Sequence, residues 1–80
     1  MFNKIQKILL EYSQYSIEID METSLRYDLG IDSLAMQSVI LDIEKEFEIE
    51  VQPHEINYKN FNCPRKIIDF IKGKSIGKYN

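Results

Sequence analysis

The fold is predicted chiefly from residues 33 to 48, which read Ser-Leu-Ala-Met-Gln-Ser-Val-Ile-Leu-Asp-Ile-Glu-Lys-Glu-Phe-Glu. At about 100° per residue, five apolar side chains of this stretch share one arc of roughly 100°, the core-facing stripe of a surface helix. These five are Met36, Val39, Ile40, Ile43 and Phe47. Asp32 precedes them and is expected to cap the helix, because its short side chain can accept hydrogen bonds from the unpaired amides of the first turn.

The opposite face of the same helix is polar, with two exceptions. It holds Gln37, Ser38, Asp42, Glu44, Lys45 and Glu48. Leu34 and Leu41 are seven residues apart and line up near the centre of this face, away from the core arc. A monomer has no need of apolar side chains there, so both leucines are candidates for contact with a partner protein.

The chain before this helix predicts one more helix and a long loop. Apolar residues at three- and four-residue steps favour a helix over residues 2 to 15, and these are Phe2, Ile5, Ile8, Leu9, Tyr12 and Tyr15. Residues 16 to 32 lose that period and contain Gly30, but they keep five apolar anchors, Ile17, Ile19, Leu25, Leu29 and Ile31. Loops of this length are uncommon in compact domains and are usually functional.

The chain after residue 48 predicts a short helical turn and a last helix. Pro53 disfavours helical geometry at the residue before it, and a short turn is expected from Pro53 to about Tyr58. The last helix should begin after Asn62, which is expected to cap it with its side chain. It should bury Ile67, Ile68, Phe70 and Ile71, and stop at Gly73. We therefore predict an all-α fold: a small bundle of three main helices plus one short helix, with the long loop between the first two. The domain should span residues 1–73, followed by a mobile tail at residues 74–80.

Length and composition exclude several classes of protein. Eighty residues allow one small domain. A formal net charge of −3, with an acidic middle and a basic end, argues against nucleic acid as a partner. The single cysteine cannot form an internal disulfide, which fits a reducing cytoplasm. No apolar run has the length of a membrane span or the form of a signal peptide, so we expect a soluble cytoplasmic monomer that does not insert into membranes.

The inventory of reactive side chains gives little support to an enzyme. One histidine, His54, and one cysteine, Cys63, cannot assemble a thiolate zinc site, and no metal site is predicted. The carboxylates between residues 42 and 50 alternate with no sign of a pocket that would separate their pKa values, so a solvated face explains them better. The three glycines are isolated and form no phosphate-binding loop.

Ser33 is the most informative polar residue. It lies in the first turn of the predicted helix 33–48, where unpaired amides and the positive end of the helix dipole favour an anion, so a phosphate ester on its hydroxyl would be well placed. On position alone, a simple capping role for Ser33 or Asp32 is the commoner explanation. No histidine or lysine lies close in sequence to activate Ser33 as a nucleophile.

The run Asp28-Leu-Gly-Ile-Asp-Ser-Leu34, followed by a helix that closes with Glu44-Lys-Glu-Phe47-Glu-Ile-Glu-Val51, resembles the acyl carrier protein family. That family has a D-S-L triplet after a glycine turn and then a helix ending in acidic residues and a phenylalanine. The resemblance covers nearly the whole chain, because the first helix, long loop, short third helix and final helix follow in the same order and length.

The resemblance implies that Ser33 receives 4'-phosphopantetheine from coenzyme A through a phosphopantetheinyl transferase. The arm's thiol would carry a thioester, and the protein would be a carrier that serves partner enzymes. It implies that Asp32 supports the attachment site, by helping to hold the transferase's metal. The partner surface would comprise Leu34, Ser38, Leu41, Asp42 and Lys45. The other expected partners are an acyl- or aminoacyl-activating enzyme and a downstream synthase or transferase.

Departures from the family pattern bear on the cargo, which is the group that the arm would carry as a thioester. Residues 34 to 38 carry no charge, whereas typical fatty-acid carriers place acidic residues there, and Cys63 stands where the family often has a capping threonine. We predict an acyl carrier of fatty-acid or polyketide-type biosynthesis. The alternatives are a stand-alone aminoacyl or peptidyl carrier, including one like the D-alanine carriers, and an unmodified acidic helical adaptor that uses Leu34 and Leu41.

Overall fold

The computed structural model describes the backbone of residues 1–79 and the side chains of residues 1–74. Within that range it contains four α-helices, one short 3₁₀ helix and no strand. They are α1 (Phe2–Tyr12), α2 (Ser33–Phe47), η1 (Pro53–Glu55), α3 (Tyr58–Phe61) and α4 (Pro64–Tyr79). The all-α prediction is confirmed, although two short pieces, η1 and α3, replace the single turn that the sequence predicts after Pro53.

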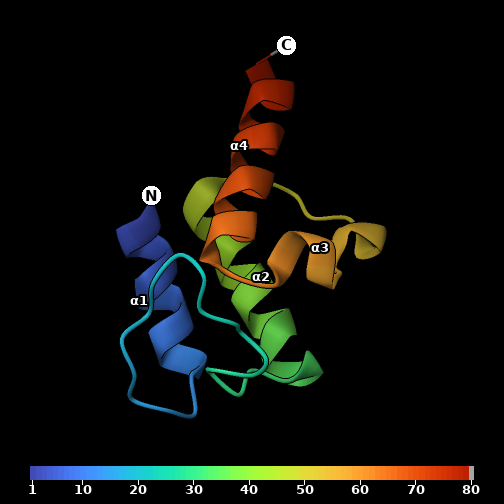
Figure 1. Ribbon diagram of the computed structural model, residues 1–80. Coiled ribbons are helices and arrows are strands. Elements are labelled where there is room, and N and C mark those ends of the chain that lie inside the picture. Colours follow the sequence, from blue (N-terminus) through green and yellow to red (C-terminus); the bar gives the residue numbers. More distant parts are fainter. Residues whose placement is uncertain (80) are drawn as a thin grey trace.

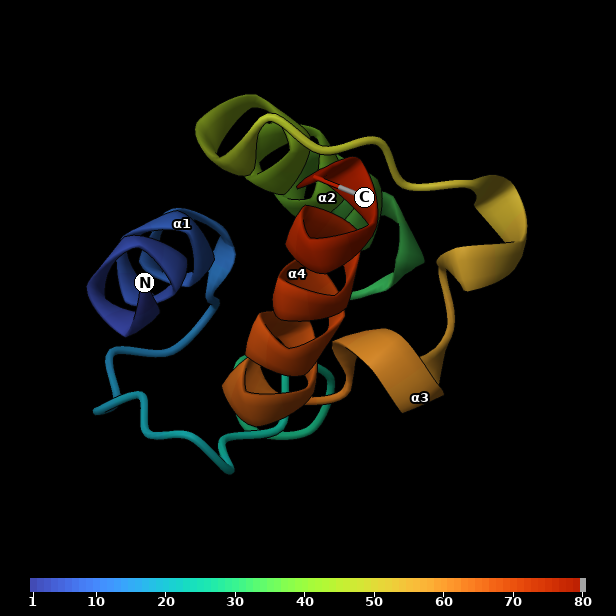
Figure 2. The ribbon, with the colours of Figure 1, turned by 90° about the horizontal axis from the view of Figure 1, so that it is seen from above.

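The three long helices enclose the core. α1 contacts α2 and α4, and α3 packs beside α4 (Figure 1). Seen from above, α4 lies between α1 and α3 (Figure 2). The buried cluster comprises Ile5, Leu9, Ile19, Leu25, Leu29, Ile31, Val39, Ile40, Ile43, Val51, Phe61, Ile67, Ile68 and Ile71. The core face predicted for α2 is confirmed at its centre, with Met36 and Phe47 half-buried at its edges. None of the helices in the described part of the chain combines the length and the apolar character needed to span a bilayer.

α1 ends three residues earlier than the periodicity predicts. Ser13 has extended backbone angles, φ −68° and ψ 137°. Its hydroxyl donates to the carbonyl of Tyr15 at 2.7 Å, and the amide of Gln14 donates to the carbonyl of Leu29 at 2.8 Å. These bonds give the chain an alternative to another helical turn, and Tyr15 is left 56% exposed. The prediction of a helix through residue 15 is therefore wrong at its end.

The long loop is anchored in the core by four of its five apolar residues. Ile19, Leu25, Leu29 and Ile31 are buried, whereas Ile17 is exposed, contrary to prediction. Backbone bonds also tie the loop to the junction of α3 and α4. The amide of Leu25 donates to the carbonyl of Asn62, and the amide of Arg65 donates to the carbonyl of Met21, both at 3.0 Å.

The bond from the amide of Arg65 to the carbonyl of Met21 means that α4 begins differently from the prediction. Asn62 was expected as a side-chain cap, but it has helical backbone angles, φ −72° and ψ −39°, and ends α3. A capping residue normally has extended angles, and here Met21 supplies an acceptor to the first turn of α4 instead. A side-chain cap is found one element earlier, where Asn57 accepts from the amide of Asn60 at 3.1 Å.

α4 also runs further than predicted, through Gly73 to Tyr79. Glycine within a helix costs about 1 kcal/mol relative to alanine, which weakens the helix without forbidding it. A Cβ at Gly73 would meet no atom within 4 Å. The predicted stop at Gly73 is therefore wrong. The backbone of residues 74–79 lies in α4, whereas Asn80 and the side chains of residues 75–79 lie outside what the structure describes. The mobility of residues 74–80 stays a prediction, as does the domain boundary at residue 73.

Two polar contacts join the elements around the bundle. The Tyr12 hydroxyl of α1 donates to the Asp42 carboxylate of α2 at 2.6 Å, and this hydrogen bond raises the pKa of Tyr12 above its ordinary value. Glu55 of η1 pairs with Lys74 of α4 at 2.7 Å. The bond from Lys74, followed by the amide of Gln52, lowers the pKa of Glu55. Both contacts link residues far apart in the sequence.

Candidate functional site

Ser33 is the first residue of α2, and its side chain is exposed. Asp32 caps the helix, because its Oδ1 accepts a hydrogen bond from the amide of Ala35 at 2.8 Å. Within the part of the chain that the structure describes, the Ser33 hydroxyl has no hydrogen-bond partner. The capping role that either residue might fill therefore belongs to Asp32, as predicted, and Ser33 presents an uncommitted hydroxyl at the positive end of the helix dipole.

The turn before Ser33 is fixed by buried residues on both sides of Gly30. Leu29 and Ile31 are buried, and the amide of Ile31 donates to the carbonyl of Leu25 at 2.9 Å. Gly30 itself has φ +68°, and a Cβ there would lie 3.1 Å from the ring of Tyr15. Glycine adopts this left-handed geometry readily, whereas other residues are strained in it. The turn thus brings the chain out of the core immediately before the exposed hydroxyl.

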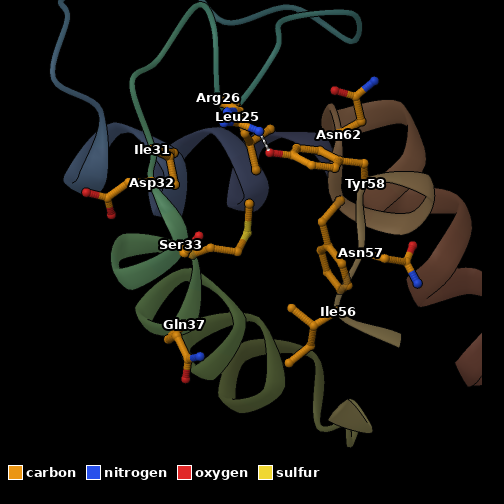
Figure 3. Close-up of a pocket in the computed structure, with 12 residues that line it drawn as sticks. Leu25, Arg26, Ile31, Asp32, Ser33, Gln37, Ile56, Asn57, Tyr58 and Asn62 are labelled. Carbon is orange, nitrogen blue, oxygen red and sulfur yellow. Dashed lines mark hydrogen bonds between the residues drawn. The ribbon is translucent and has the colours of Figure 1, made fainter. Parts of the chain in front are cut away.

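A pocket of about 300 Å³ lies beside Ser33. The start of α2, the end of the long loop and the segment from Ile56 to Asn62 line it together. Its apolar lining comes from Leu25, Ile31, Met36, Ile56 and Phe61. Figure 3 shows Ile56 and Tyr58 pointing into the space from the α3 side, while Asp32 and Gln37 point away from it. Ser33 therefore lies beside a pocket whose walls are partly apolar and partly polar.

Two residues at the edge of this pocket were not predicted as site residues. The Arg26 guanidinium donates a hydrogen bond to the Tyr58 hydroxyl, and the two side chains meet over the pocket (Figure 3). Arg26 also lies over the rings of Tyr27 and Tyr58, at 5.6 and 5.4 Å from their centres. The only sequence signal was that Arg26 is the single basic residue among residues 16 to 32.

The predicted partner surface is partly exposed. Leu34 is 81% and Leu41 61% exposed, as the helical geometry predicts. Lys45 is exposed and Ser38 is half-buried. Asp42 is half-buried, and its carboxylate accepts the hydrogen bond from Tyr12 of α1. The two leucines are thus the most prominent apolar side chains of α2 on the solvent side, whereas Asp42 also takes part in packing.

The single histidine and the single cysteine lie outside the pocket lining. His54 is exposed in η1, and Cys63 is buried and free. No group of three or more histidine, cysteine, aspartate or glutamate side chains among the described residues could hold a metal ion. The site consists of one exposed serine hydroxyl beside a pocket.

Comparison with known families decides what this arrangement is. The family model for the phosphopantetheine attachment site matches residues 3–71. The chain belongs to this family. The resemblance to acyl carrier proteins that the Asp28–Leu34 run suggests is confirmed by relatives. The chain is 37% identical over 76 residues to the acyl carrier protein of Buchnera aphidicola (strain 5A), with 94% of this chain and 92% of that protein covered.

Two further relatives come from other organisms. The acyl carrier protein of Phytoplasma mali is 35% identical over 74 residues, which cover 89% of this chain and 83% of that protein. That of Myxococcus xanthus is 32% identical over 56 residues, which cover 70% of this chain and 68% of that protein. The match to this family extends from α1 into α4.

The residues present fit a phosphopantetheine group. Ser33 offers an exposed oxygen that has no partner among the described residues, and the pocket beside it has partly apolar walls. When bound, the group supplies a thiol that forms thioesters. The residues of this chain would hold its phosphate end at the start of α2, where the helix dipole favours negative charge.

Asp32 provides a prediction at this site. Asp32→Ala should lower the free energy of unfolding by about 1 kcal/mol, because it removes the N-cap of α2. Asp32→Asn keeps a capping oxygen and should unfold close to the wild type. Urea denaturation of the three proteins measures the difference, and an asparagine variant as unstable as the alanine variant would contradict the cap.

The same pair of variants separates capping from a role in loading. If Asp32 supports the transferase through its charge, Asp32→Asn should slow phosphopantetheine transfer although its stability is unchanged. The rate of mass gain in the presence of coenzyme A and a transferase measures this. Equal rates for Asp32→Asn and wild type would show that the charge of Asp32 has no part in the transfer.

Proposed function

We propose that Ser33 receives the phosphopantetheine arm and that the protein carries acyl intermediates as thioesters in fatty-acid or polyketide-type biosynthesis. The observation that carries the proposal is the exposed Ser33 hydroxyl, which has no partner among the described residues and lies beside a pocket of about 300 Å³. The names of the relatives, all acyl carrier proteins, support the same function. In this role the protein is a carrier and not an enzyme.

The attachment step needs an external catalyst. The Ser33 oxygen forms a bond to phosphorus of coenzyme A, its proton leaves to a base, and the adenosine bisphosphate part of coenzyme A departs. Among the described residues no basic side chain accepts a hydrogen bond from the Ser33 hydroxyl, and the base would come from the phosphopantetheinyl transferase. Asp32 and the turn at Gly30 position the hydroxyl, and the N-terminus of α2 favours the phosphodiester once formed.

The expected partners are the enzymes that would attach the arm, load it and accept the acyl group. Besides the transferase, the protein would meet an acyl-activating enzyme and a downstream synthase or transferase, and it would do so as a cytoplasmic monomer. The absence of charge from Leu34 to Ser38 supports partners that recognise apolar contacts there more than acidic ones. The same absence is the feature that favours the second candidate, an aminoacyl or peptidyl carrier.

A loading experiment can determine whether the protein carries acyl groups or amino acids. The protein carrying its arm is offered acyl groups with an acyl-activating enzyme and amino acids with an aminoacyl-adenylating enzyme, both from the same source, and thioester formation is read from intact mass. We expect an acyl group to be loaded in clear preference. A strong preference for amino acids would reject the fatty-acid function and favour the aminoacyl carrier.

The partner surface gives a further prediction. Leu41→Glu should reduce the rate of acyl transfer to a partner severalfold while leaving the melting temperature nearly unchanged, because Leu41 is 61% exposed. Leu10→Glu is a matched control, since Leu10 is 54% exposed on α1. Transfer rates and thermal melts of both variants check the prediction. Equal transfer by Leu41→Glu and Leu10→Glu would contradict a partner role for Leu41.

A further inference from the structure

Arg26 is the one cationic side chain among the residues that line the pocket beside Ser33. Its orientation is restrained, because the guanidinium lies over the rings of Tyr27 and Tyr58 and donates to the Tyr58 hydroxyl. A guanidinium held in this way keeps its remaining N–H groups available for hydrogen bonds. Figure 3 shows Arg26 at the edge of the pocket where it meets Tyr58, with Ser33 beside the same pocket at the start of α2.

Arg26 differs from the other arginine of the chain in its partners. Arg65 forms an ion pair with Glu22. Arg26 forms no ion pair with any carboxylate in the described residues. A guanidinium has five N–H donors, and the bond to Tyr58 occupies one of its nitrogens. Arg26 therefore keeps both its full charge and several donors for an anion.

The surroundings of Ser33 make a cation useful there. Asp28 and Asp32 lie within five residues of Ser33, and both are exposed. A phosphodiester on Ser33 adds a further negative charge to this acidic segment, with the N-terminus of α2 as its nearest compensation. Arginine matches phosphate oxygens in a bidentate geometry that lysine does not offer.

We propose that Arg26 pairs with the phosphate of the arm on Ser33 and so holds the arm over the pocket. The inference rests on the proposed function, since it requires a phosphodiester at Ser33. Arg26 acts here as a positioning residue: it bonds to the arm and takes no part in the chemistry of the thiol. Tyr27 and Tyr58 keep the guanidinium at the pocket edge.

The test is phosphorus-31 NMR of the protein after its arm has been attached. Wild type, Arg26→Gln and the control Arg65→Gln are compared at low salt. We expect Arg26→Gln to shift and narrow the phosphorus resonance, because the phosphate loses its partner and moves more freely, while Arg65→Gln leaves it in place. Added salt should move the wild-type resonance toward that of Arg26→Gln and leave the variant unaffected.

A second measurement needs no substitution. The side-chain Nε–H resonance of Arg26 in the wild type should shift when the arm is attached, whereas that of Arg65 should not. An unchanged Arg26 resonance, or the same phosphorus resonance in wild type and Arg26→Gln, would overturn the inference. Failure of the proposed function is distinguishable, because the wild type would then gain no mass when treated with coenzyme A and a transferase.

Discussion

Ser33→Ala is expected to abolish attachment of phosphopantetheine, with no detectable gain in mass after incubation with coenzyme A and a broad-specificity transferase. The variant removes the oxygen that would bond to phosphorus. Without this oxygen no phosphodiester can form at position 33. Ser16→Ala is the matched control, because Ser16 is exposed like Ser33 and lies outside the predicted partner surface. This variant should gain the same mass as the wild type.

The loss of attachment should not reflect loss of fold. Asp32 supplies the cap of α2, and the Ser33 hydroxyl contributes no hydrogen bond within the described residues, so Ser33→Ala should melt close to the wild type. Circular dichroism of the variant checks this. Equal mass gain in Ser33→Ala and wild type would place the attachment elsewhere and reject the proposed role of Ser33.

Phe61→Ala is expected to cost about 3–5 kcal/mol of stability, the range for deleting a buried aromatic side chain. Phe61 is 2% exposed, and its ring centre lies 5.1 Å from that of Phe70. Native proteins have only about 5–15 kcal/mol of stability in total, so this variant should lose a large part of it. The urea midpoint measures the loss.

The reason for so large an effect lies in α3. A helix of four residues cannot be stable alone, so packing of Phe61 against α4 has to hold it in place. Phe61→Leu, which keeps most of the apolar volume, should lose much less stability, and Tyr58→Ala should also lose less, because Tyr58 is 55% exposed. A Phe61→Ala variant as stable as Tyr58→Ala would show that this packing is unimportant.

The parts of the fold that could be predicted from the sequence are those set by local patterns. The core face of α2 follows from its helical period, and the Asp32 cap follows from its place before the first turn. The sequence predicts helix ends wrongly where backbone groups that are distant in the sequence form hydrogen bonds with them. α1 ends early because the chain bonds to Leu29 and Tyr15, and α4 begins with an acceptor supplied by Met21.

In the candidate site, too, some residues could be predicted from local sequence and others could not. Ser33 could be predicted because its neighbours in sequence form the motif and the helix start. Arg26 could not, because its role depends on Tyr58, which is 32 residues away in the chain and reaches it only in the folded protein. A sequence pattern could not predict the pocket either, because its walls come from the loop, α2 and the residues around α3.

The central claim is that the arm is attached to Ser33. Tandem mass spectrometry of the wild-type protein, digested after incubation with coenzyme A and a transferase, tests it most directly. We expect a single added phosphopantetheine, located by the fragment ions on Ser33. An added group on another hydroxyl, such as that of Ser24 or Ser38, or no added group at all, would contradict it.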